Sequence, residues 1–168
     1  MIVVSDTTPL ISLMKIGQLD LVKQLFGEVQ IPNAVYEELV SNTRFLDERR
    51  QIQKCSFIKR VEVTDVQAVK LLRRSAGLDA GESEAIVLSD SLKASLLLMD
   101  EAKGRQVAMQ MGIQIMGTIG MLLAAYKENL LSKEEILRCV EILQTTGRHI
   151  SEKLYKQLMK RISELEGK

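Results

Sequence analysis

Acidic residues follow two short apolar runs of the sequence. Asp6 comes shortly after residues 2–4, and Asp100 comes directly after residues 96–99. Both runs have the composition of buried strands, and the carboxyl ends of strands in an open parallel sheet share one edge, where ligands bind. We therefore expect Asp6 and Asp100 to be neighbours in space. Carboxylates gathered at such an edge point to a divalent cation.

Each of these two acids also has a structural explanation. Asp is a good N-cap, and a helix is predicted to follow Asp6 immediately. Thr7 or Thr8 could fill that capping role, which would leave the Asp6 carboxylate free. Asp100 could cap the next predicted helix, and Glu101 stands in a first turn, where the helix dipole favours acids. We favour the ligand interpretation because both aspartates end an apolar run.

A third acid lies on the helix predicted for residues 33–40. Glu37 and Glu38 are adjacent and therefore point in different directions. Val35 and Leu39 mark the apolar face of this helix, and Glu38 lies next to that face. Glu38 is the predicted ligand of the pair.

The segment after Leu78 offers two more acids, Glu82 and Glu84. Asp79 and Glu82 have the spacing of a capping box, so Glu82 has a purely structural alternative. Glu84, two residues on, faces elsewhere on a regular helix. We prefer Glu84 as the ligand, while both could contribute if the first turn of the helix is tilted over the site.

Carboxylates in such a group repel one another. Two of them about 4 Å apart cost roughly 4 kcal/mol at an effective dielectric constant of ~20. A bound cation removes this cost, and ligands that are all oxygen suit Mg²⁺ or Mn²⁺ rather than Zn²⁺. A cation of this kind activates water and screens the charge that develops on a phosphodiester. The acids therefore predict a metal-dependent nuclease.

Length and composition fit an ordinary globular protein. The chain has 168 residues, 46% of them hydrophobic, and we expect a single domain over 1–168 with 132–168 as a helical C-terminal appendage. Its 23 basic and 22 acidic residues give a net charge of +1, which neither indicates nor excludes a nucleic-acid partner. We expect no signal peptide, because the first residues lack a basic region and a long apolar stretch, and no apolar run of the sequence is long enough to span a bilayer. The expected location is the cytoplasm, without membrane contact.

Short apolar runs alternate with amphipathic patterns along the chain, which predicts an α/β fold with a mostly parallel sheet. A last helix carries an apolar stripe that either packs back on the domain or forms a dimer or partner surface. The expected strands are 2–4, 28–31, 57–63, 96–99 and 113–115. The expected helices are 9–14, 19–26, 33–40, 44–54 (as a charged, exposed arm), a helix from the box 64–67, 78–93, 103–111, 117–126, one from the box at Ser132 and one after Ser151.

Four short motifs, taken in order, resemble the PIN-domain family of metal-dependent ribonucleases. They are Asp6-Thr7-Thr8-Pro9, Pro32-x-x-Val35-x-x-Glu38-Leu39, Gly81-Glu82-x-Glu84-Ala85-Ile86 and Leu98-x-Asp100-Glu101. The resemblance covers residues 1–126 and is nearest to a prokaryotic branch with the turn Gly117-Thr118-x-Gly120. It implies a three-layer α/β/α sandwich around a parallel sheet, followed by C-terminal helices.

The resemblance also implies roles for individual residues. Asp6 would be the first metal ligand, oriented by Thr7 or Thr8, and Glu38 would be the second. Glu84 or Glu82 would be the third, and more distant flap endonucleases use both acids of such a segment. The remaining implied site residues are Asp100 as the fourth acid, Glu101 where many relatives carry a second Asp, and Thr118 at the edge of the site. Lys103 and Arg105, just after Asp100, are candidate phosphate contacts.

The function implied is an endoribonuclease that uses Mg²⁺ or Mn²⁺ and a metal-activated water to cleave RNA. Many members are VapC-type toxins with a small antitoxin, so an antitoxin partner and a homodimer are expected possibilities. The alternative is a catalytically silent PIN-like module that binds RNA or a partner protein. A phosphatase or phospho-receiver is disfavoured because Thr8 stands where a second Asp is expected.

Overall fold

A parallel sheet forms the centre of the molecule. The computed structural model describes residues 1–41, 46–147 and 150–167. Within them, five strands pair in the order β3-β2-β1-β4-β5, and each pairing is parallel. The strands are β1 (Val3–Ser5), β2 (Val29–Pro32), β3 (Ile58–Val61), β4 (Leu96–Leu98) and β5 (Ile115–Met116). The predicted α/β fold with a parallel sheet is confirmed.

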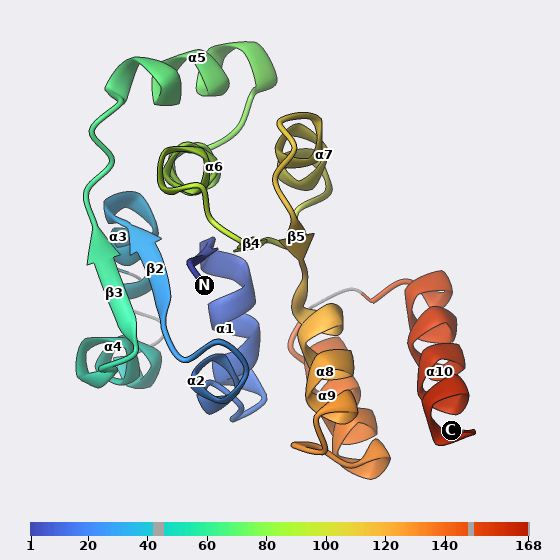
Figure 1. Cartoon of the computed structure of the whole chain (residues 1–168). Helices are drawn as coiled ribbons and strands as arrows, with labels where there is room; N and C mark the ends of the chain where they lie inside the picture. Colours follow the sequence, from blue (N-terminus) through green and yellow to red (C-terminus); the bar gives the residue numbers. More distant parts are fainter. Residues whose placement is uncertain (42–45, 148–149, 168) are drawn as a thin grey trace.

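Helices connect the strands and cover the sheet (Figure 1). In chain order they are α1 (Thr7–Lys15), α2 (Asp20–Phe26), α3 (Asn33–Ser41), α4 (Leu46–Lys54), α5 (Val66–Ala76), α6 (Ala80–Leu92), α7 (Ala102–Gln110), α8 (Thr118–Lys127), α9 (Lys133–Thr145) and α10 (Glu152–Glu166). Each expected helix has a counterpart here, although part of the segment 44–54 lies outside the described residues.

The two faces of the sheet bury different residues because side chains alternate along a strand. Val3 and Leu98 pack in one hydrophobic cluster with residues of α1, α2, α8 and α9. Val4, Leu97 and Met99 pack in a second cluster with α6 and α7. Strands buried on both faces read as continuous apolar runs, which is why the runs at 2–4 and 96–99 identified the central strands.

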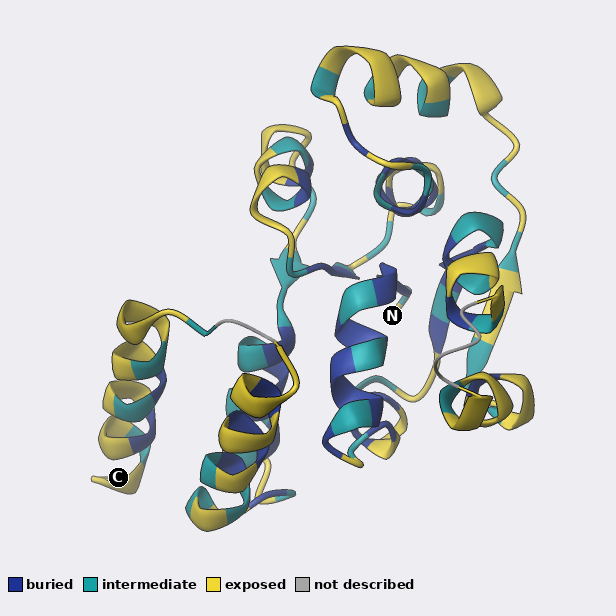
Figure 2. Ribbon diagram, turned by 180° about the vertical axis from the view of Figure 1, so that it is seen from behind, coloured by how far each residue is buried: buried dark blue, intermediate teal, exposed yellow. Residues whose placement is uncertain are grey.

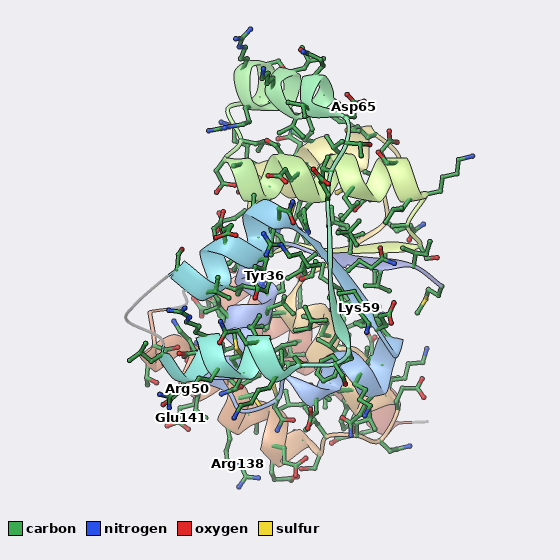
Figure 3. The ribbon with its side chains drawn as sticks, turned by 90° about the vertical axis from the view of Figure 1, so that its left-hand side faces the viewer. Tyr36, Arg50, Lys59, Asp65, Arg138 and Glu141 are labelled. Atoms are coloured by element: carbon green, nitrogen blue, oxygen red, sulfur yellow. The ribbon has the colours of Figure 1, made fainter. Side chains whose placement is uncertain are left out.

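The central position of β1 and β4 brings their ends together. Ser5 pairs with Leu98, and the backbone N–H of Asp6 donates to the carbonyl of Leu98 at 2.9 Å. Asp6 and Asp100 therefore leave neighbouring strands at the same edge of the sheet. Helix α3, which carries Glu38, lies between α4 and α6 beside this edge (Figure 3).

Local capping signals set the starts of several helices. The capping boxes Asp79/Glu82 and Ser132/Glu135 both form, as the sequence predicts. The box predicted from Thr64 is wrong, because α5 is capped one residue later by Asp65, whose carboxylate accepts from the N–H of Ala68. An Asp carboxylate is at least as good an N-cap as a Thr hydroxyl, so the neighbouring residue takes the position.

The two C-terminal helices pack on the domain. Ile136, Val140 and Leu143 of α9 and Leu158 and Ile162 of α10 belong to the same hydrophobic cluster as α1 and α8. Figure 2 shows the buried positions of α10 turned toward α8 and α9, and its exposed positions turned away. The apolar stripe predicted on the last helix thus packs back on the domain at these positions.

Other expectations are met in part. The segment expected as an exposed arm contains α4, and Ile52 on this helix is buried. The last strand is Ile115–Met116, slightly later than expected. Cys139 is buried, Cys55 is half-buried, and both are free thiols. In the part of the chain that is described, every helix is too short or too polar to cross a membrane.

Candidate metal centre

Asp6 is the most deeply buried acid of the centre, with an exposed fraction of 3%. It stands at the N-cap position of α1, but its side chain makes no capping hydrogen bond. Burial, together with the charges of Asp79, Glu38 and Glu82, raises the pKa of Asp6 from 3.8 to about 7, against a lowering hydrogen bond from the backbone of Thr7. The Asp6 carboxylate therefore does not serve as a helix cap.

Glu38 reaches the same place from α3. The Thr7 hydroxyl donates to Oε2 of Glu38 at 2.6 Å. The residue as a whole is exposed, but its carboxyl end is shielded. Burial of that end, followed by the charges of Asp79, Glu82 and Glu84, raises the pKa of Glu38, while the bond from Thr7 lowers it. Thr7 was expected to orient Asp6; its backbone does contact Asp6, but its hydroxyl holds Glu38.

Gly81 makes room for the Glu38 carboxylate. A Cβ atom at position 81 would lie 2.5 Å from Oε1 of Glu38, closer than side-chain carbons approach oxygens. Gly81 lies in the first turn of α6 and is buried. The close approach of α3 and α6 at this point therefore depends on the absence of a side chain.

Asp79 belongs to the centre, although sequence reasoning assigned it only a capping role. Its charge raises the pKa values of Asp6, Glu38 and Glu82. One Asp79 oxygen accepts from the N–H of Glu82 at 2.8 Å, and Oε2 of Glu82 accepts from the N–H of Asp79 at 3.0 Å. The signal that could have identified Asp79 is its place two residues before Gly81, at a predicted helix start.

Glu82 and Glu84 both approach the centre but differ in their contacts. Glu82 is held in the capping box, and burial raises its pKa, as do Asp79 and Glu101, whereas Lys103 lowers it. Glu84 is half-buried, and its charge acts on Glu38. The preference for Glu84 as a ligand stays a prediction.

Asp100 is held by the start of α8. Its Oδ1 accepts from the backbone N–H of Thr118, and its Oδ2 accepts from the Thr118 hydroxyl, both at 2.7 Å. The α8 dipole adds to the stabilisation of this negative charge. A Cβ at Gly117 would lie 2.8 Å from Oδ1 of Asp100, so Gly117, like Gly81, leaves space for a carboxylate. Thr118 is thus a supporting residue of Asp100.

The carboxylates are not arranged to coordinate a single ion. In the described ranges, no three His, Cys, Asp or Glu side chains gather closely enough to hold an ion. Asp6, Glu38, Asp79 and Glu82 interact through their charges, and Asp100 is turned toward Thr118. Side-chain rotations would be needed to bring three of these acids around one cation.

A comparison with known protein families gives a match over nearly the whole chain. The family described as PIN domain (DUF3368) matches residues 2–164, nearly the whole chain. The chain belongs to the PIN domain family. PIN domains are typically metal-dependent nucleases, and they typically use Mg²⁺ or Mn²⁺. Among curated proteins, no sequence gives a significant match.

The residues of this PIN domain suit such a cation in their chemistry. The donors are carboxylate oxygens, which Mg²⁺ and Mn²⁺ prefer. The charge on buried Asp6 is disfavoured, as its raised pKa shows, and a cation would offset that cost. Two glycines, Gly81 and Gly117, give space to Glu38 and Asp100.

Two cations border the acids of the PIN domain. Lys103 extends from α7 toward the carbonyl of Gly77 at 3.5 Å, and its charge acts on Glu82. Arg105 donates from Nη1 to the carbonyl of Met99 at 2.9 Å, and Nη1 lies close to Gly117. Both predicted phosphate contacts are therefore near the acids.

The arginines of α4 and α5 lie on well-separated helices and do not form one basic track. Arg50 on α4 and Asp65 at the start of α5 lie toward opposite ends of the view in Figure 3, and Figure 1 also separates the two helices.

The raised pKa of Asp6 predicts how stability depends on pH without a cation. Between pH 4 and pH 7, the folded protein holds a proton on Asp6 that the unfolded chain has released. The protonated Asp6 side chain therefore contributes fully to the free energy of unfolding at low pH, and this contribution is lost as the pH rises toward 7. In EDTA, wild type should lose stability relative to Asp6→Asn over this range, by on the order of 4 kcal/mol.

Urea unfolding of both proteins at several pH values measures this difference. Asp90→Asn, at an exposed position of α6, is the matched control and should track wild type. A wild-type curve parallel to that of Asp6→Asn would contradict the burial of the ionised group.

Gly81→Ala should weaken cation binding without destabilising the helix. The new methyl group would occupy the position of the Glu38 carboxylate and force it away from Asp6. Calorimetric titration with Mn²⁺ should show an affinity about tenfold lower, as for other disturbed ligand supports. Gly167→Ala, where the added carbon meets only ordinary contacts, is the control. Unchanged Mn²⁺ affinity in Gly81→Ala would remove Glu38 from the metal centre.

Proposed function

We propose that this protein is an endoribonuclease that depends on Mg²⁺ or Mn²⁺. The observation that supports this most is the buried Asp6 carboxylate, with Glu38, Asp79 and Glu82 around it, at the carboxyl edge of a parallel sheet. Four like charges at one place are unfavourable unless a proton or a cation neutralises them. Membership of the PIN domain family supports a nuclease, and the resemblance noted in the sequence supports RNA as its substrate.

The proposed ligands are Asp6, Glu38, Glu84 and Asp100, with Glu82 and Glu101 at the margin. A bound cation would supply Lewis-acid polarisation of the phosphate and lower the pKa of water. Thr7 positions Glu38, and Thr118 positions Asp100, through the hydrogen bonds described above. Lys103 and Arg105, which border the acids, are the proposed contacts of the RNA phosphates.

A second candidate is a catalytically silent PIN-like module. It is favoured by the finding that no three acids of the described residues form a ready cage, and by the engagement of Glu82 in a capping box. Such a module would bind RNA or a partner protein without a cation. Titration with Mn²⁺ separates the two candidates, because only the nuclease requires an ion at Asp6.

A role as the toxin of a toxin–antitoxin pair is a further proposal from the family resemblance. An adjacent short reading frame encoding a DNA-binding start and an acidic tail would support it. A homodimer is proposed on the same basis, and light scattering of the purified protein would test it.

Asp6→Asn should abolish cleavage while the fold is retained. The amide keeps the shape of the carboxylate but cannot carry its charge, so the cation is held less firmly. We expect the rate on a labelled RNA pool with Mn²⁺ to fall about 10²-fold or more, the scale seen when a key electrostatic group is removed. Asp90→Asn should keep full activity. Wild-type activity in Asp6→Asn would overturn the proposed centre.

Glu82→Gln and Glu84→Gln should differ in their effect on cleavage. Glu82→Gln keeps an oxygen that can accept from the N–H of Asp79, so the capping box is retained, and both stability and much of the cleavage activity should remain. Glu84→Gln should leave stability nearly unchanged and remove cleavage. Urea unfolding and the same RNA assay measure both effects. The reverse pattern would assign the third ligand position to Glu82.

A further inference from the structure

A groove runs along the surface where α10 packs beside α8 and the end of the sheet. Its volume is about 820 Å³. One wall consists of β5 and the first turns of α8, and the other consists of α10.

One end of the groove reaches Asp100 at the sheet edge. Asp100, the fourth proposed ligand, forms part of its lining, as does Arg105. Gly117 lies between them, since a Cβ there would meet the Asp100 carboxylate at 2.8 Å and Nη1 of Arg105 at 2.9 Å. A chain that enters the groove at this end therefore passes beside the proposed metal centre.

The far wall of the groove adds two basic side chains, Lys160 and Arg161. Both are exposed, and no ion pair joins either of them to another described residue. By contrast, Lys156 on the same helix pairs with Glu152 at 3.3 Å. With Arg105, the groove has three cations against the acids Asp100 and Glu164. If a bound metal ion neutralises Asp100, the three basic side chains face only the carboxylate of Glu164. The groove then attracts an anionic chain.

The floor of the groove is aliphatic. Met116, Ile119 and Leu123 line it, and its described lining contains no aromatic ring. Aromatic rings supply most base stacking in proteins that hold single strands, so this floor offers bases an apolar surface without strong selection. The charged wall offers phosphates the main attraction. This combination suits a single strand bound through its backbone.

The wall formed by α10 is anchored. Leu158 and Ile162 of α10 are at most 2% exposed, and α8 is the helix that α10 contacts most. Lys160 and Arg161 stand beside these buried positions and are carried by a packed helix. Their positions relative to Asp100 are thus fixed by the core.

We propose that this groove binds the single-stranded RNA that flanks the cleaved bond, and that Lys160 and Arg161 of α10 bind its phosphates. The proposal rests on the proposed nuclease function, because that function is the reason for the strand to pass beside Asp100. It makes the C-terminal helix a part of the substrate-binding surface with little preference for base sequence.

Binding can be measured apart from cleavage in the Asp6→Asn background. A labelled oligouridine strand is titrated with this protein in Mg²⁺, and fluorescence anisotropy gives the affinity at several salt concentrations. Lys160→Ala/Arg161→Ala is compared with Lys153→Ala/Lys156→Ala, which removes the same charge from α10 outside the groove. Circular dichroism melts confirm that both double variants fold.

We expect the Lys160/Arg161 variant to bind about tenfold or more weakly at low salt. The slope of log affinity against log salt should become shallower by about 1.4, because each single-strand phosphate contact contributes about 0.7. The Lys153/Lys156 variant should bind like the parent. Equal losses in both variants, or no loss in either, would overturn the proposal.

A competition experiment separates RNA from an acidic protein segment. An oligoglutamate peptide that displaces the RNA from the parent at lower concentration than unlabelled RNA would overturn the proposal in favour of a protein partner. A cleavage assay with the native Asp6 residue then tests the nuclease function by itself. Cleavage that the Lys160/Arg161 change leaves untouched would contradict the groove alone, whereas groove-dependent binding without any cleavage would contradict the nuclease alone.

Discussion

The burial of one carboxylate at the end of the central strand is the constraint on which the centre depends. Asp6 follows β1, which the strand order places next to β4, and the charges of Glu38 on α3 and of Asp79 and Glu82 at the start of α6 act on it. Its charge is removed from water and surrounded by like charges, so the ionised form needs a partner. Thr7 and the two glycines at 81 and 117 allow the neighbouring acids to stay close in spite of this cost.

The fold could be predicted from the sequence because its signals are local. Runs such as 96–99 identify buried strands, and pairs such as Ser132/Glu135 identify helix starts. Strands that alternate with helices favour parallel pairing through crossovers, whereas the order β3-β2-β1-β4-β5 is known only from the assembled structure. The start of α5 was misplaced by one residue because Thr64 and Asp65 are both capping residues, and Asp65 takes the N-cap position.

The centre was less predictable because its contacts join distant residues. Sequence spacing cannot show that Thr7 donates to Glu38 or that Thr118 donates to Asp100. Asp79 was missed as an acid of the centre because its capping role is a sufficient local explanation. The sheet places that cap beside Asp6, and only the assembled fold gives it a second neighbour.

The capping box of α6 couples two processes that are usually separate. Glu82 closes the first turn of α6 through the N–H of Asp79, and both carboxylates face the acids at the sheet edge. If an ion drew either carboxylate to itself, the turn would lose a hydrogen bond worth about 1 kcal/mol. That cost would be subtracted from the binding free energy of the ion. Ion occupancy and unwinding of the first turn of α6 would then be thermodynamically linked, so that hydrogen exchange at the N–H of Asp79 would respond to the metal.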